Sequence, residues 1–498
     1  MRRTERAIFL LAGLGCAGYA AAQTQAPVLT IYSSARPGFA EPQFRGPASV
    51  DPGSVPGYGI VQEHTTLELP AGRSTLRYPG VPAAIDPATV RVRSLTDPET
   101  RVLEQRFEFD FQNTATLLQR YVGHEVVVEQ IRNGGVVASE GRLVAVLDGL
   151  VLEQDDGTMQ LIRAYDNIRF PQLPMDLVAR PTLVWTVDTR QAGAHDTRIT
   201  YETRGLTWWA DYGAVVREGD EGCRLDLDSW ATVVNYSGAA YPDARLRLVV
   251  GEPQRAGSSA PMAMMESRAA DASGPADFAR QAVSEYHLYT LERATSLPRN
   301  AVTQIRLGAP VAGVACEKAY VYDGLGGHWP RAPRPLLEPQ IGPEPSRAIS
   351  SYLSFQNERD AGLGVPLPAG RVRVSEVGPD EQDPIFAGEH IIGHTAEGEE
   401  VRLRLGTAFD LTGERRQTDF RVDSARQVLE EEILIELRNA KDRPVTIAAE
   451  EQLYRWANWA IVEQSSDFQR LDARTVRFPV TVPAGGTAQV RYRVRYTW

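Results

Sequence analysis

The chain has 498 residues, 43% of them hydrophobic and 23% charged, which suits several domains with sizeable cores. Its formal net charge of −11 opposes non-specific binding to nucleic acid or to an anionic membrane, because both need a basic surface. Only Lys318 and Lys441 among the 53 basic residues are lysines, a bias that we read as genomic and not as phosphate recognition.

The first residues predict export from the cytoplasm. Three arginines stand among the first six residues, and residues 7–20 are apolar and uncharged. Ala20, Ala21 and Ala22 then supply the small-residue pattern of a signal-peptidase site, which predicts cleavage after Ala22. The apolar run is shorter than the roughly 20 residues that span a bilayer. Acylation at Cys16 is the alternative, but it needs a large aliphatic residue where Gly13 stands. No later stretch resembles a membrane span, so we expect no membrane insertion of the mature chain.

Residues 23–57 are rich in Pro, Gly and Ser and predict a disordered tether. Alternating strands are expected from Tyr58, and residues 58–112 predict an N-terminal β module. The next segment, 113–172, predicts a short helix over 113–121, ended by Gly123, and then about five short strands joined by Gly-containing turns. A helix followed by five strands resembles a small Sm-like or SH3-like barrel, which we expect to be closed.

Two turn signals recur in the remaining chain. Pro-Ala-Gly follows a strand at residues 70–72, 368–370 and 483–485, and a strand runs into asparagine at Asn235, Asn357 and Asn439. Pro and Gly suit tight reversals, and Asn tolerates positive φ. These signals predict a mainly β fold with several antiparallel sandwich-like units and few helices. We expect one β domain over 173–410, with mobile insertions near 255–281 and 324–348, and a C-terminal sandwich-like unit over 411–498.

From about Arg180 to the C-terminus the chain resembles a bacterial family, the proteins that carry domain of unknown function 4139 and are related to the mucoidy-inhibitor proteins. The strings that carry the resemblance include Gly205 to Tyr212, Asn235 to Gly238, Glu285 to Leu291, Gly362 to Gly370, Phe409 to Arg415 and Leu471 to Val476. The resemblance implies a β-rich envelope domain without an established reaction. The relatives have a coiled coil ahead of this domain, where this chain has the small barrel-like segment.

Trp209 and Asp211 are the candidate binding residues. They lie in Trp208-Trp209-Ala210-Asp211-Tyr212, and alternate residues of a strand face opposite sides, so Trp209 and Asp211 share one face while Trp208 and Tyr212 share the other. One interpretation is a platform for a sugar or peptide, with Asp211 as a hydrogen-bond acceptor. The other is ordinary packing, which is the commoner role of such aromatic residues.

Cys223 and Cys316 are the two cysteines that remain after the leader is removed. In an oxidising compartment they could form a disulfide. Two buried thiols are the equal alternative.

The remaining patterns do not indicate catalysis. His390 and His394 are four residues apart, but Gly393 lies between them and Ile391 and Ile392 favour a strand, on which the two rings would lie too far apart to share a metal. There is no G-x-S-x-G motif and no recognisable protease context for either cysteine. We therefore expect no catalytic residues and no cofactor. The sequence favours an exported envelope scaffold or binding module for a protein or glycan, with an envelope hydrolase acting on glycan or peptide as the alternative.

Overall fold

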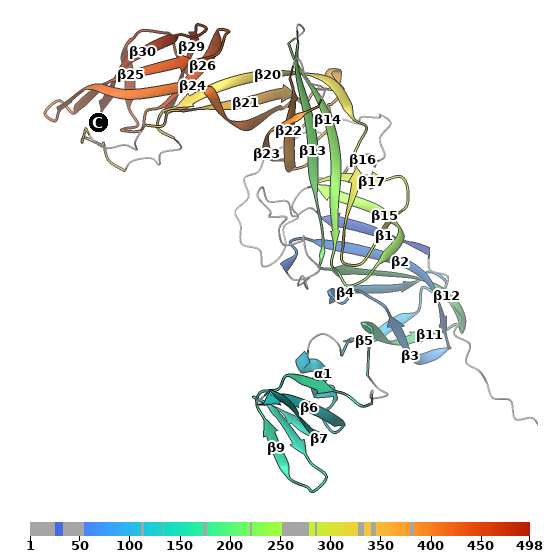
Figure 1. Cartoon of the computed structure of the whole chain (residues 1–498). Helices are drawn as coiled ribbons and strands as arrows, with labels where there is room; N and C mark the ends of the chain where they lie inside the picture. The colour runs from blue at the N-terminus through green and yellow to red at the C-terminus, as the bar shows by residue number, and fades with distance from the viewer. Residues whose placement is uncertain are drawn as a thin grey trace, which may run out of the picture.

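The computed structural model describes residues 25–32, 54–110, 114–132, 134–172, 177–219, 222–250, 278–283, 286–326, 333–339, 345–378 and 383–498. The predicted cleavage site after Ala22, most of the predicted tether and most of the predicted insertion at 255–281 lie outside these residues. The described residues form four β-sheets and one α-helix, so the expected mainly β fold is confirmed. The sheets follow one another in an extended arrangement, with the helix-containing unit at one end and the C-terminal strands at the other (Figure 1). Within these residues no helix has the length and apolarity that a membrane crossing requires.

The first sheet has eight strands. In spatial order they are β16 (Phe278–Val283), β17 (Tyr286–Leu291), β15 (Tyr241–Val250), β1 (Gln25–Tyr32), β2 (Tyr58–Leu69), β12 (Gly193–Thr203) and β4 (Ile85–Ser94), with β18 (Thr295–Leu297) also paired to β15. The prediction of a tether from residue 23 is wrong for β1, which lies between β15 and β2 with Leu29 and Ile31 fully buried. Its short run of β-branched and aromatic residues was masked by the Pro- and Gly-rich composition of the longer window.

A three-stranded sheet packs beside the first. It contains β3 (Gly72–Pro79), β11 (Thr182–Thr189) and β5 (Arg101–Glu108). Because β11 and β12 pair with strands that precede residue 113, the N-terminal β module is completed by strands from the far side of the small unit. The small unit is therefore an insertion between β5 and β11.

The small unit begins with α1 (Thr114–Arg120), which confirms the predicted helix. Five strands follow, in the spatial order β10 (Asn167–Arg169), β6 (Glu125–Arg132), β7 (Gly135–Val146), β8 (Leu150–Glu153) and β9 (Met159–Ile162). Leu118 and Tyr121 pack with Val126, Leu143 and Leu152 into a separate small core. No ladder joins β9 to β10 among the described residues, so the sheet is open and the expected closure is not observed.

The fourth sheet has fourteen strands and runs through two cores. Its main path is β23 (Ile385–Ile392), β22 (Gly370–Val377), β13 (Leu206–Gly219), β14 (Gly222–Asn235), β20 (Val311–Asp323), β21 (Ala348–Gln356), β24 (Glu400–Asp423), β25 (Val428–Asn439), β30 (Thr487–Thr497) and β27 (Trp459–Gln464). Strands β19 (Ala301–Arg306), β26 (Val445–Gln452), β28 (Gln469–Arg470) and β29 (Thr475–Val482) branch from it, and a 3-10 turn spans Arg359–Ala361.

Strand β24 crosses from one core to the other. Val401 and Leu403 belong to the large central core, whereas Leu411 belongs to the C-terminal core. Strand β20 also links the two, because it pairs with β14 at one end and with β26 at the other. Continuous strands of one sheet therefore run from the central core to the C-terminal core (Figure 1).

The three asparagines at strand ends are buried and occupy equivalent positions. The side-chain amide of Asn235 donates to the carbonyls of Ala239, Leu297 and Pro298. Asn439 donates in the same way to the carbonyls of Arg443, Val482 and Pro483. Asn357 donates to the carbonyls of Val365 and Ala396. In each case the strand at whose end the Asn stands pairs with the strand that follows the accepting carbonyls in the chain: β14 with β19, β21 with β24 and β25 with β30.

Candidate functional site

Strand β13 places Trp209 and Asp211 on one face and Trp208 and Tyr212 on the other. Trp208 and Tyr212 are buried in the central core, and Trp208 Nε1 donates to the carbonyl of Val249 at 3.3 Å. Trp209 and Asp211 are both partly exposed on the opposite face. The alternation expected of a strand therefore holds through this segment.

Asp211 accepts hydrogen bonds from three side chains of three different strands. Its Oδ2 accepts from Trp209 Nε1 at 2.9 Å and from Thr232 Oγ1 at 2.5 Å, and its Oδ1 accepts from Arg371 Nη2 at 3.2 Å. The strand register explains the convergence, since Thr232 stands directly opposite Trp209 and Arg371 directly opposite Asp211. A carboxylate held by three donors is well placed to orient its neighbours.

The ring of Trp209 is covered in part by the chain itself. It packs against a small apolar group formed by Val55, Val234 and Tyr236. Val55 precedes β2 and is buried. This contact supports the packing interpretation for Trp209, while the partial exposure of its edge leaves the neighbouring surface accessible.

A second tryptophan lies beside Asp211 that the sequence patterns did not single out. Trp230 stands opposite Asp211 on β14, and the Arg306 guanidinium lies 4.7 Å from the centre of its ring. Arg306 also pairs with Asp228 at 2.7 Å. Alternation from Asp228 to Thr232 would have placed Trp230 on this face, but only the pairing of β13 with β14 brings it next to Asp211.

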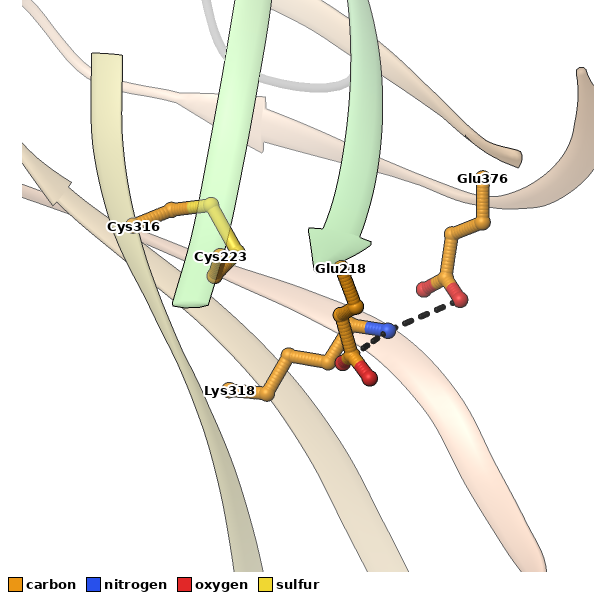
Figure 2. Close-up of a disulfide and its surroundings, with 5 residues drawn as sticks. All are labelled: Glu218, Cys223, Cys316, Lys318 and Glu376. Carbon is orange, nitrogen blue, oxygen red and sulfur yellow. Dashed lines mark hydrogen bonds and ion pairs between the residues drawn. A yellow bond between two sulfur atoms is a disulfide. The ribbon is translucent and has the colours of Figure 1, made fainter. Parts of the chain in front are cut away.

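Cys223 and Cys316 are joined as a disulfide between directly opposed residues of β14 and β20, with their Cα atoms 5.0 Å apart (Figure 2). Beside it Lys318 lies between two carboxylates, with Nζ 2.7 Å from Glu218 and 2.9 Å from Glu376. Arg443 from the C-terminal unit also pairs with Glu218 at 3.2 Å. The four charged side chains, Glu218, Lys318, Glu376 and Arg443, line a cleft of about 370 Å³.

Opposite charges in this cleft shift the pKa values of Glu218 and Lys318 toward their ionised forms. Burial raises the pKa of Glu218, but hydrogen bonds and charges from Lys318 and Arg443 outweigh it and lower the pKa below its ordinary value. Burial likewise lowers the pKa of Lys318, and the two carboxylates more than reverse this. Glu218 is therefore unsuited to act as a general acid near neutral pH.

The two histidines weighed as metal ligands do not meet at a metal-binding group. His390 lies on β23, and burial, followed by the charge of Arg404, lowers the pKa of its ring. His394 accepts a hydrogen bond from the backbone N–H of Ala369 at 2.9 Å. In the part of the chain that the structure describes, no three His, Cys, Asp or Glu side chains gather as metal ligands would.

Comparison of the chain with models of protein families finds no match, and comparison with curated proteins finds none either. The resemblance to the domain of unknown function 4139 family therefore stays a prediction.

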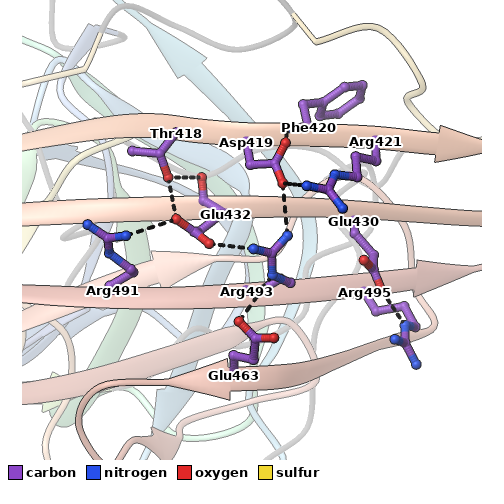
Figure 3. A network of polar contacts seen from close by, with 10 residues as sticks. All are labelled: Thr418, Asp419, Phe420, Arg421, Glu430, Glu432, Glu463, Arg491, Arg493 and Arg495. Atoms are coloured by element: carbon purple, nitrogen blue, oxygen red, sulfur yellow. Dashed lines mark hydrogen bonds and ion pairs between the residues drawn. The ribbon is translucent and has the colours of Figure 1, made fainter.

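The C-terminal sheet carries the densest network of charges, and it is internally paired (Figure 3). Arg493 on β30 contacts Glu432 at 2.6 Å, Asp419 at 3.0 Å and Glu463 at 3.3 Å. Arg495 pairs with Glu430 and Arg491 with Glu432. Because each arginine of β30 faces a carboxylate of a neighbouring strand, the network neutralises this face and stabilises the pairing of its strands.

Proposed function

We propose that this chain is an exported, non-enzymatic scaffold of the cell envelope that binds a protein or glycan partner. The observation that carries the proposal is the continuity of β20 and β24 through both cores, because it makes the central and C-terminal sheets one stiff body. Stiff, extended sheets with broad faces suit binding and positioning of a partner.

Three further observations are compatible with this proposal. Strand β1 begins at Gln25, so cleavage after Ala22 would remove no described residue of the first sheet. The disulfide suits an oxidising compartment. The resemblance to the domain of unknown function 4139 family implies a β-rich envelope domain, and the Sm-like or SH3-like assignment of the small unit is part of the same proposal.

The state of the carboxylates favours binding over hydrolysis. Asp211 is engaged by three donors, and Glu218 and Glu376 are bridged by Lys318. A glycosidase needs one carboxyl group with a raised pKa next to a second that stays ionised. Lys318 between the two glutamates lowers the pKa of Glu218, which is the opposite of what a general acid requires.

In-cell photo-crosslinking tests the proposal. A photoreactive residue at Gln304, which is exposed next to Thr232, should give a discrete adduct in the envelope, whereas the same residue at Arg421 in the paired C-terminal network should not. Intact-mass analysis of the envelope protein should show a chain that starts at Gln23. Retention in the cytoplasm, or release of glycan or peptide fragments that is lost in Asp211→Asn, would overturn the proposal.

A further inference from the structure

The outer face of the eight-stranded sheet carries five arginines. Arg91 and Arg93 lie on β4, Arg198 on β12, and Arg245 and Arg247 on β15. Directly opposed residues share a face of a sheet, and the register gives one row across five strands and a second row next to it. The first row is Arg91, Thr200, Gln62, Val28 and Arg245, and the second is Arg93, Arg198 and His64.

These arginines lack the carboxylate partners that the arginines of the C-terminal strand β30 have. Among the described residues none of the five forms an ion pair, and the only acceptors of Arg91 are the carbonyls of Ala88 and Val90. The buried Nε of Arg198 has no hydrogen-bond acceptor. The C-terminal sheet shows the contrast, since there Arg493 alone meets three carboxylates (Figure 3).

The arrangement is unfavourable for the isolated protein. Arg93 stands directly opposite Arg198, and like charges in that position destabilise a strand pair. The same face also carries Glu68, Asp86, Asp196 and Glu202, but among the described residues no ion pair joins one of these carboxylates to the five arginines. Five arginines that form no ion pair within the described chain are available to the carboxylates of an anionic ligand.

We infer that this face binds an acidic glycan, an extended polysaccharide with repeated carboxylate groups. The inference rests on the proposed binding function and gives it a ligand class. The row from Arg245 to Arg91 crosses four strand spacings, about 19 Å, which suits an extended ligand and not a single small anion. Arginine forms bidentate hydrogen bonds with carboxylates.

The same face favours a sugar chain over a peptide. Strands β1, β2 and β12 are paired on both sides, so their backbones have no free edge to which a peptide strand could be added. Between the arginines stand the partly exposed side chains of Thr30, Gln62 and Thr200, which can bond sugar hydroxyls. Tyr32 and Tyr58 stack on this face with ring centres 4.6 Å apart and offer an aromatic surface to a sugar ring.

Binding of polygalacturonate to the purified full chain tests the inference, with neutral dextran and poly-L-glutamate as comparison ligands. We expect polygalacturonate to bind and to weaken as NaCl screens the charges, and we expect no binding of dextran. The double variant Arg198→Gln/Arg245→Gln should raise the Kd at least tenfold. Arg421→Gln/Arg426→Gln removes the same two charges from exposed C-terminal positions and should leave the Kd unchanged.

Several outcomes would overturn the inference: no binding of polygalacturonate, equal binding of poly-L-glutamate, or an equal loss in both double variants. Melting curves show whether Arg198→Gln still folds, and the exposed Arg247→Gln replaces it in the double variant if it does not. Absence of binding would remove this ligand class but leave the crosslinking test of a scaffold untouched. Cleavage of the polygalacturonate into shorter chains would instead contradict the non-enzymatic function, but it would still support binding of an acidic glycan to this face.

Discussion

The side-chain amide of Asn439 donates to the carbonyl of Pro483 at 3.1 Å, and Asn235 stands in the same relationship to Pro298 at 3.0 Å. In both units the Asn ends one strand and the Pro begins the turn before the strand that pairs with it. The Oδ1 atoms of the two asparagines accept the backbone N–H two residues further on, from Ser237 and from Lys441. In both places one Asn side chain thus links the end of a strand to the turn that precedes its partner strand.

Replacing Asn439 with Ala is expected to destabilise the C-terminal unit. The change removes the amide that bonds the carbonyls of Arg443, Val482 and Pro483 and the Oδ1 that accepts from the Lys441 N–H, which should cost about 3 kcal/mol of the free energy of unfolding. Urea unfolding should detect it as an earlier C-terminal transition. Asn458→Ala serves as the control, because Asn458 is exposed and bonds only Thr497, and it should change stability by less than about 0.5 kcal/mol. Equal effects would show that the hydrogen bonds of Asn439 stabilise the fold no more than the bond of an exposed side chain does.

The recurrence of Pro-Ala-Gly and of strand-end Asn was visible in the sequence because turn chemistry is local. The partners of the asparagines were not, since Asn439 and Pro483 are 44 residues apart and only the pairing of β25 with β30 brings them together. The same holds for Asp211, whose alternation with Trp209 was predictable but whose bond to Arg371 spans 160 residues. Strand β1 was missed because composition over a long window hid eight residues whose burial depends on strands far along the chain.

Reduction of the disulfide is expected to weaken the junction of β14 and β20. The bond closes a loop with a sequence separation of 93, for which loss of chain-entropy restriction costs at most about 4–5 kcal/mol. The native protein should resist thiol alkylation at Cys223 and Cys316, and Cys223→Ser/Cys316→Ser should unfold at a lower urea concentration. Ready alkylation of both thiols without reductant would contradict the bond.

One buried and one partly buried tyrosine next to Glu63 predict a loss of stability in alkali. Tyr78 and Tyr201 donate to the two oxygens of Glu63 at 2.5 and 2.6 Å, and they link the three-stranded sheet to the eight-stranded one. Burial, followed by the charge of Glu63, raises the pKa of both phenols. A raised folded-state pKa means that their stabilising effect is complete below about pH 10 and is lost above it, as the unfolded chain ionises.

An alkaline titration followed by absorbance at 295 nm and by circular dichroism checks this. The absorbance of the buried tyrosines should rise only together with unfolding. Tyr78→Phe/Tyr201→Phe should reduce the rise in absorbance that accompanies unfolding, while exposed tyrosines titrate as before. Reversible ionisation of both phenols near pH 10 with unchanged circular dichroism would contradict the pairing with Glu63.

Substitutions of Trp209 distinguish a packing role of its ring from a role in binding a partner. Its ring is partly buried against Val55, Val234 and Tyr236, so Trp209→Ala should cost about 2–3 kcal/mol, less than the roughly 3–5 kcal/mol of a fully buried ring. Trp209→Phe keeps most of the packing and loses the bond to Asp211, which should cost about 1 kcal/mol. Urea unfolding of the two variants measures these differences.

If Trp209→Ala leaves stability unchanged but abolishes the adduct at Gln304, the ring belongs to a binding surface and the contact with Val55 contributes little. If stability falls while Trp209→Phe still gives the adduct, Trp209 supports the site from below, and Trp230 with Arg306 is the part of it that faces a partner.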